Sequence, residues 1–208
     1  MLRLSKWFSN FVSRKKEIKV TPQLLAGTLN LIVMKHFDSL LEFIKENHIS
    51  TSETQINQMF SELFCFYYSL YSFRLGDHLT SHADMNFYGA ALLKEARRLL
   101  SDSDLPDSIR RWVRQDSYFL PDFDSRFRFY YHNAIPQTEQ ESIDGIARFC
   151  QTEKSNPISY LATKLQFRIS TFLRMTPSNR MFIPLWICQS ATVIGFTRTL
   201  NHTRPVLR

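Results

Sequence analysis

Two histidines in the sequence have the spacing of paired metal ligands. His78 and His82 are four residues apart, with Asp77 and Asp84 on either side of them. Positions i and i+4 share one face of a helix, so two imidazoles and a carboxylate could reach a single zinc or iron ion. A third ligand from elsewhere in the chain would still be required, and such pairs more often mark a solvated helix start. We therefore predict no metal and no cofactor, and His78 and His82 are the candidates if a metal is bound.

The segment from Arg126 to His132, with the sequence RFRFYYH, alternates cations with aromatic rings. Guanidinium groups bind phosphates and aromatic rings stack on bases, a combination that suits single-stranded nucleic acid. The alternative is a segment at the edge of the core, in which the Arg stems lie over the rings.

The spacing of Arg126 and His132 resembles the Arg-x(4–6)-His pattern of HEPN ribonucleases. That family is all-helical, and the resemblance implies that Arg126 and His132 cut RNA at a dimer interface without a metal. It covers seven residues, and Phe127 stands where family members usually carry a polar residue. Gly-rich phosphate loops and the G-x-S-x-G and HExxH motifs are absent from the sequence. We therefore favour a non-catalytic protein and keep a HEPN-like metal-independent ribonuclease as the alternative function.

Charge divides the chain into three blocks that together give a net charge of +7. Residues 1–19 contain six Lys or Arg and one Glu, whereas residues 20–153 contain 12 basic and 18 acidic side chains. Residues 154–208 contain eight Lys or Arg and no Asp or Glu. Cations without nearby carboxylates produce a strong local field. The leading hypothesis is therefore an interaction protein whose basic ends contact a nucleic acid, an anionic membrane or an acidic protein partner.

The C-terminal block supplies the candidate residues for binding a polyanion. They are Lys164, Arg168, Arg174, Arg180, Arg198 and Arg204. The first three belong to a helix expected from Asn156-Pro157 to about Met175, whose inward stripe includes Leu165 and Ile169. Phosphate backbones bind such cations by counterion release, with a strong dependence on salt. The alternative is that these cations pair with the acidic middle block.

The N-terminal segment predicts a second interface. Its apolar residues recur at helical spacing with Lys and Arg off that face, and the candidate residues are Leu4, Trp7, Phe8, Phe11, Lys15 and Lys16. An amphipathic basic helix fits an anionic membrane surface, where apolar burial and charge attraction add. The alternative is that the helix docks on its own domain or on a subunit, so a protein partner or a homo-oligomer is also expected.

Cysteine use and hydropathy predict the compartment. The three cysteines are widely spaced without a CxxC motif, and the N-terminal residues lack the apolar stretch of a secretory signal. An intracellular, reducing compartment is expected, with peripheral membrane binding as a possibility. Residues 181–197 are uncharged, but they include Pro184 and several polar side chains. We interpret them as a buried helix and expect no stable transmembrane span.

Helices must position all of these residues. Capping signals and periodicity predict helices at about 22–47, 52–76, 77–100, 106–114, 138–152, 157–175 and 181–200. Residues 117–136, with Pro121 and Pro136 near their two ends, are hard to assign to a helix or a loop. The sequence has 18 Phe and only five Gly, which favours helices around an aromatic core. We predict an all-α fold in which a basic N-terminal segment, 1–19, precedes a single domain, 20–208, of about seven helices. Residues 59–73 contain seven aromatics and predict a central core helix; a cavity along it for an apolar ligand or lipid gives a third possible function.

Overall fold

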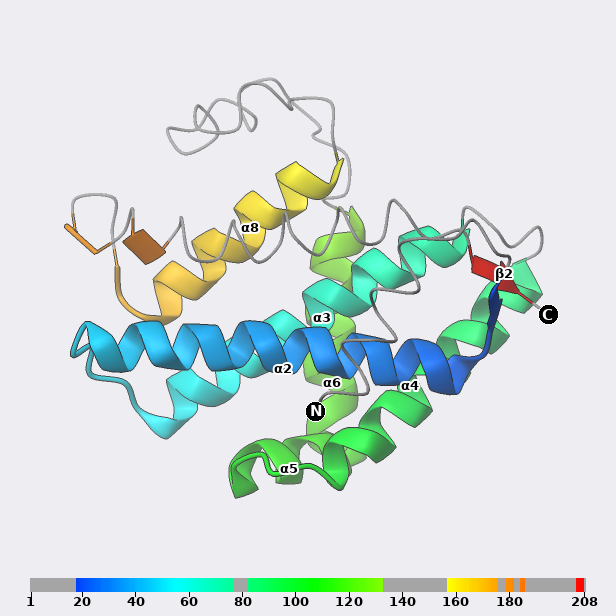
Figure 1. The fold of residues 1–208 in the computed structure, drawn as a ribbon, viewed down its shortest axis with the longest axis horizontal. Coiled ribbons are helices and arrows are strands. Elements are labelled where there is room, and N and C mark those ends of the chain that lie inside the picture. Colours follow the sequence, from blue (N-terminus) through cyan, green and yellow to red (C-terminus); the bar gives the residue numbers. More distant parts are fainter. Residues whose placement is uncertain are drawn as a thin grey trace.

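The structure is a computed structural model, and it describes residues 18–76, 82–132, 157–175, 179–181, 184–185 and 205–207. Within these residues there are six helices: α2 (Pro22–Glu46), α3 (Glu53–Gly76), α4 (His82–Ser101), α5 (Asp107–Arg114), α6 (Asp116–His132) and α8 (Pro157–Phe172). The two short strands are β1 (Ile18–Val20) and β2 (Pro205–Leu207) (Figure 1). The predicted all-α fold class is therefore confirmed, with one short strand pair added to it.

The first two helices begin at the predicted capping residues. Thr21 accepts a hydrogen bond from the backbone N–H of Leu24 at 3.3 Å, and Pro22 occupies the first helical position. Ser52 and Gln55 form a capping box, in which Gln55 N donates to Ser52 Oγ at 3.2 Å and Ser52 N donates to Gln55 Oε1 at 2.8 Å. The amide nitrogen of the same Gln55 side chain donates to the Phe172 carbonyl, so the start of α3 also caps the end of α8.

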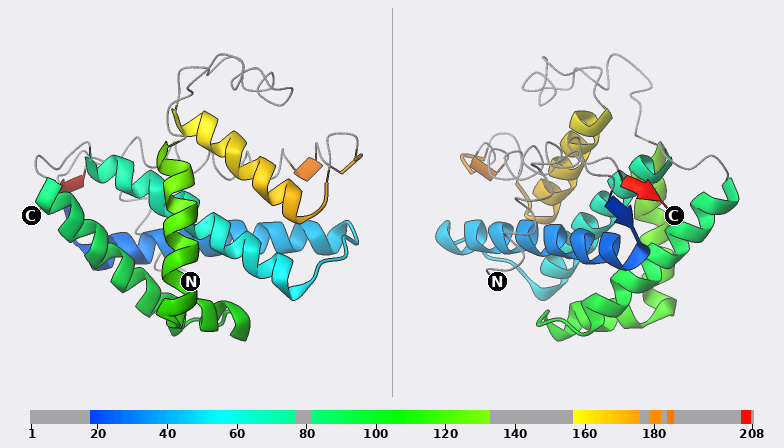
Figure 2. Two further views of the ribbon diagram at one scale, coloured as in Figure 1. Left: turned by 180° about the vertical axis from the view of Figure 1, so that it is seen from behind. Right: turned by 45° about the vertical axis from the view of Figure 1, so that its right-hand side comes forward.

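Helix α3 is the centre of the bundle and contacts α2, α4, α5, α6 and α8 (Figure 2). Every side chain from Met59 to Tyr71 is buried, as expected for a helix that is apolar on more than one face. The Phe64 ring, for example, contacts the rings of Trp112, Phe119 and Phe123, at centroid distances of 6.1–6.3 Å. The prediction of an aromatic core helix is confirmed.

Helix α6 contradicts the expectation that Pro121 bounds a segment, because Pro121 lies inside the helix. The rings of Phe119, Phe123 and Phe127 are stacked along one side, with centroid distances of 5.3 and 5.7 Å and interplanar angles of 13° and 7°. Each aromatic contact of this kind is worth about 0.5–1.5 kcal/mol beyond area burial. Ring packing on both sides of Pro121 therefore helps to offset the missing backbone hydrogen bond.

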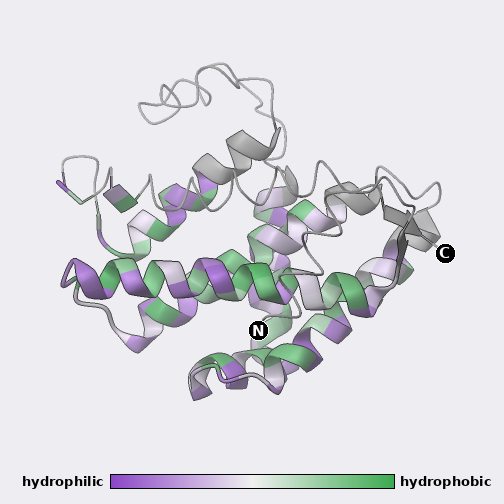
Figure 3. Ribbon diagram, in the orientation of Figure 1, coloured by the Kyte–Doolittle hydropathy of each residue, from purple (hydrophilic) through white to green (hydrophobic). Residues whose placement is uncertain are grey.

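Helix α4 lies against α2 and approaches α3 closely near its start. Asn30 of α2 donates to the Ala96 carbonyl at 2.9 Å, and the Tyr68 hydroxyl of α3 donates to the Gly89 carbonyl at 2.9 Å. A Cβ atom at Gly89 would lie 3.3 Å from that hydroxyl, which explains the glycine at this position. Polar and apolar residues alternate around α2, α4 and α5, the pattern of helices with one buried face (Figure 3).

The two strands join distant parts of the sequence. β1 and β2 pair in parallel, with Ile18 opposite Pro205, Lys19 opposite Val206 and Val20 opposite Leu207. The pair lies at one end of the molecule, whereas the end of α8 lies at the other (Figures 1 and 2).

Several expectations fall outside the described residues. These are the N-terminal helix, the helix at 138–152 and most of the helix at 181–200. Within the described part of the chain, α2 has the length and composition to cross a membrane. Core helices pass the same test, and ten of its side chains are buried in the bundle. The absence of a stable transmembrane span stays a prediction, as does the division into residues 1–19 and 20–208.

Candidate functional site

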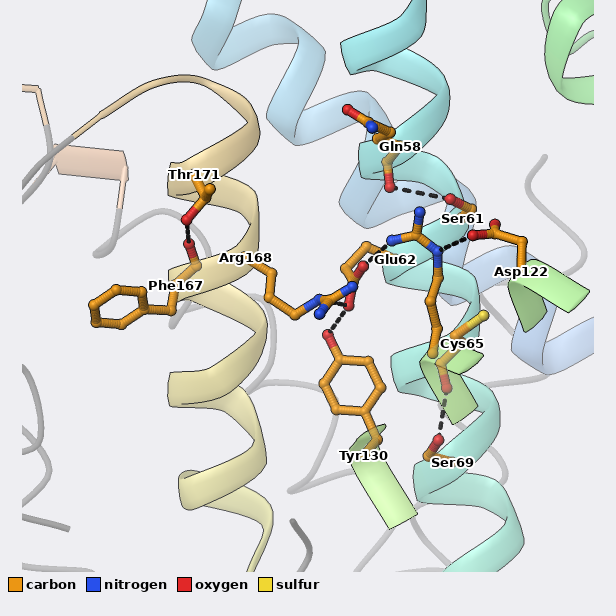
Figure 4. A network of polar contacts seen from close by, with 11 residues as sticks. Gln58, Ser61, Glu62, Cys65, Ser69, Asp122, Tyr130, Phe167, Arg168 and Thr171 are labelled. Atoms are coloured by element: carbon orange, nitrogen blue, oxygen red, sulfur yellow. Dashed lines mark hydrogen bonds and ion pairs between the residues drawn. The ribbon is translucent and has the colours of Figure 1, made fainter. Parts of the chain in front are cut away.

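A buried carboxylate on α3 joins three helices. Glu62 is 0% exposed, and its two oxygens form ion pairs with Arg126 of α6 and Arg168 of α8. The Tyr130 hydroxyl of α6 donates a hydrogen bond to Glu62 Oε1 at 2.6 Å. Figure 4 shows Arg168 and Tyr130 directed at Glu62 from the two neighbouring helices. We call Glu62, Asp122, Arg126, Tyr130 and Arg168 the Glu62 cluster.

A second carboxylate balances the charge of this cluster. Arg126 Nε donates to Asp122 Oδ1 at 2.8 Å, and Trp112 Nε1 donates to the other oxygen of Asp122 at 3.1 Å. Two guanidinium groups therefore face two carboxylates, and the cluster is neutral. Burying unbalanced charge costs several kcal/mol per ion, which makes this balance a condition for placing Glu62 in the core.

Helical spacing brings the cluster together. Asp122, Arg126 and Tyr130 are four residues apart along α6 and share the face that meets α3. Arg168 lies on α8 between the buried Leu165 and Ile169, so the face that packs on α3 also carries the guanidinium. Its guanidinium carbon lies 4.6 Å from the Phe129 ring centroid, and that of Arg126 lies 5.7 Å from the Phe172 ring centroid.

The protonation of the cluster favours a structural role. Burial lowers the pKa of Arg126, but Glu62 and Asp122 outweigh this effect and raise it, so the guanidinium stays charged. Burial raises the pKa of Tyr130 well above its usual value, and the Glu62 carboxylate raises it further. Cys65 lies one turn beyond Glu62, and its thiol pKa is raised by burial and by that same carboxylate. Neither side chain therefore supplies a nucleophile near neutral pH.

A second buried polar contact lies between α2 and α3. His36 Nδ1 is 2.9 Å from the Tyr67 hydroxyl oxygen, and both side chains are 0% exposed. His36 Nε2 has no hydrogen-bond partner among the residues that the structure describes. Complete burial lowers the pKa of His36 to about 3, so the imidazole is neutral in the folded protein.

The structure brings together two residues that the sequence assigned to different functions. Arg126, a candidate ribonuclease residue, and Arg168, a candidate polyanion ligand, both bind Glu62. Arg126 is only 11% exposed and is held by Glu62 and Asp122. The side chain of His132 lies outside the described residues, so the HEPN-like ribonuclease stays a prediction.

The other candidate residues are spread over the chain. Lys164 is partly exposed, whereas Arg174 and Arg180 are exposed at and beyond the end of α8. His82 is the first residue of α4, and no cluster of three or more potential metal ligands occurs among the described residues. The candidates outside the described residues are Leu4, Trp7, Phe8, Phe11, Lys15, Lys16, His78, Arg198 and Arg204.

Glu62, the central residue of the cluster, was not among the site residues predicted from the sequence. Its only signal was position: Glu62 is the one charged side chain in the apolar run 59–73. A buried charge requires partners, and they come from helices far along the chain. No protein-family model matches the chain, and no curated protein or solved structure matches it either.

Proposed function

We propose that the protein is a non-catalytic helical binding protein that contacts a polyanion through its paired basic ends. The observation that supports this proposal is the parallel pairing of β1 with β2. The pairing joins the basic N-terminal block to the acid-free C-terminal block. Lys19 lies within β1, Lys15 and Lys16 precede β1 in sequence, and Arg204 and Arg208 flank β2.

Chain connectivity limits how far apart these cations can be. Lys19 lies opposite Val206 in the strand pair, and Arg204 and Arg208 are the residues directly before and after β2 in sequence. An extended polyanion presents charges along its whole length, so the cations of the two blocks can each contact a different phosphate of one molecule.

The body of the bundle contributes little free positive charge to this surface. The guanidinium groups of Arg126 and Arg168 are neutralised by Glu62 and Asp122 within the protein. Arg174 and Arg180 follow α8, at the end of the molecule opposite the strand pair (Figures 1 and 2). The proposed surface therefore consists of Lys15, Lys16, Lys19, Arg204 and Arg208, rather than the whole basic C-terminal block.

Salt-dependent binding of a labelled single-stranded RNA tests the proposal. The expected result is a logarithmic salt slope that falls by about 0.7 for each contacting cation removed, as in Lys19→Gln and Arg204→Gln. Lys35→Gln, which removes an exposed lysine of α2, is the matched control and should leave the slope unchanged.

Phosphatidylserine-containing vesicles form the second arm of the same experiment. Binding to vesicles but not to RNA would identify a membrane surface as the polyanion, with the same variants affected. No salt-dependent binding to either probe, or equal slopes for all three variants and the unmodified protein, would contradict the proposal.

A further inference from the structure

The described part of the chain has an open groove of about 410 Å³ between α4 and the end of α5. Its apolar floor is formed by Ala90 and Leu93 of α4 and Val113 of α5. Phe87, 69% exposed, precedes Ala90 by one turn on the same face of α4 and extends the apolar surface. Pockets for small molecules begin at about 300 Å³, so the groove has the size for a small ligand.

Reciprocal arginine contacts fix the two walls of the groove. Arg97 of α4 donates through Nε and Nη2 to the Val113 carbonyl near the end of α5, at 2.9 and 2.7 Å. Arg114 of α5 donates to the Ser101 carbonyl at the end of α4, at 2.6 Å. Each helix therefore caps the other, and both walls are ordered before any ligand arrives.

Three of the four cations that line the groove are engaged within the protein. Arg97 pairs with Asp116 at 2.6 Å, and Arg98 pairs with Glu95 at 2.7 Å and with Asp102 at 3.7 Å. Arg114 forms no ion pair with the described residues, and its guanidinium donates to the Ser101 carbonyl.

Lys94 also lines the groove and is exposed. No hydrogen bond or ion pair joins it to another described residue. The groove therefore combines an apolar floor with one lysine outside the ion pairs, whose charge also acts on the neighbouring Glu95.

We propose that this groove binds a small amphiphile with a single negative charge, such as a free fatty carboxylate. The apolar chain lies on Ala90, Leu93 and Val113, and the carboxylate meets Lys94. The other three cations of the lining, Arg97, Arg98 and Arg114, are already engaged by carboxylates or by the Ser101 carbonyl, so Lys94 is the one left for a ligand headgroup. This site is distinct from the paired basic ends and does not depend on the function proposed for them.

The test uses the full chain and two probes, 8-anilinonaphthalene-1-sulfonate followed by fluorescence and decanoate followed by calorimetry. Both are expected to bind saturably with one molecule per chain, and decanoate is expected to displace the fluorophore. Ala90→Trp places a large side chain on the floor at an exposed helical position and should abolish binding. Lys94→Gln should weaken binding by up to about fivefold, the range of an exposed charge pair, while Lys35→Gln should not.

Decylammonium, a cation with a chain as long as that of decanoate, tests whether the groove selects a negative headgroup. Decylammonium should displace the fluorophore more weakly than decanoate does, because Lys94 repels it. The proposal is overturned if neither probe binds at low millimolar concentration, if Ala90→Trp binds normally while its circular dichroism shows a folded protein, or if decylammonium competes as well as decanoate. Binding only to anionic vesicles, with no free decanoate bound, would also overturn it.

Discussion

Arg168 of α8 ion-pairs with Glu62 of α3, and the two residues come from sequence blocks of opposite net charge. The Glu62 carboxylate is completely buried and the Arg168 side chain is 32% exposed, so the pair lies where α8 covers the core. One of the cations that the sequence leaves without local partners is therefore used to attach a helix.

Replacing Glu62 should destabilise the bundle strongly. Glu62→Gln removes the carboxylate that pairs with both Arg126 and Arg168 and leaves Asp122 alone to balance two guanidinium groups. Breaking a buried ion pair from one side costs about 3–5 kcal/mol. Chemical denaturation should report this loss of unfolding free energy. Glu42→Gln, at an exposed position of α2, is the matched control and should change stability by no more than about 0.5 kcal/mol. A loss below about 1 kcal/mol for Glu62→Gln would mean that the buried pair is not formed.

Arg168 and Arg174 should respond differently to substitution, although both were candidate polyanion ligands. Arg168→Met should lower the free energy of unfolding and leave the salt slope of RNA binding unchanged, because its guanidinium is paired with Glu62. Arg174 is exposed with φ of 54°, so Arg174→Asn suits the left-handed backbone and should leave stability unchanged. An altered salt slope in a fully folded Arg168→Met protein would show that Arg168 belongs to the RNA-binding surface.

His36 should make the protein less stable in acid. Its pKa is lowered from 6.5 to about 3 by burial, so between these values the unfolded chain binds a proton that the folded protein does not. Stability is therefore lost as pH falls from 6.5 towards 3, by at most about 1.4 kcal/mol per pH unit.

His36→Gln keeps a hydrogen-bonding group beside Tyr67 and should flatten this pH dependence, measured by denaturation across the same range. His48→Asn, at an exposed position with φ of 51°, serves as the control and should retain it. Equal pH profiles for His36→Gln and the unmodified protein would show that His36 does not titrate between the two states.

Cys65 should be unreactive in the folded protein. Burial and the nearby Glu62 carboxylate raise the pKa of its thiol, and only the thiolate reacts. In a Cys150→Ser/Cys188→Ser variant, Ellman's reagent at mildly alkaline pH should label Cys65 only after denaturant is added. Rapid labelling of the native variant would show that α3 is accessible at this point.

The sequence predicted those parts of the fold that depend on local signals. Thr21, Pro22, Ser52 and Gln55 act within one turn of their own helix, so their types and spacing were enough to place the starts of α2 and α3. The aromatic run of α3 was likewise assigned to the core by its own periodicity. Pro121 was misinterpreted because its tolerance depends on how the rings of Phe119 and Phe123 pack, both on each other and on Phe64 of α3.

The contacts that define the sites were not predictable in the same way. Arg126 and Arg168 were visible as cations, but their common partner Glu62 is separated from both by more than sixty residues. The groove depends on two hydrogen bonds between helices, from Arg97 to the Val113 carbonyl and from Arg114 to the Ser101 carbonyl. No sequence motif specifies these contacts. The pairing of Lys19 with Val206 joins two segments too short to predict as strands.

The strand pair also sets an order of events during synthesis of the chain. Its sequence separation exceeds that of any other contact described here, and closing so long a loop carries the largest entropic cost. β1 is translated first but has no partner until β2 has emerged, long after the residues of α2 to α6. The two basic blocks therefore meet late, and a nascent chain that stops before Pro205 carries a helical core without the strand pair on which the proposed cationic surface depends.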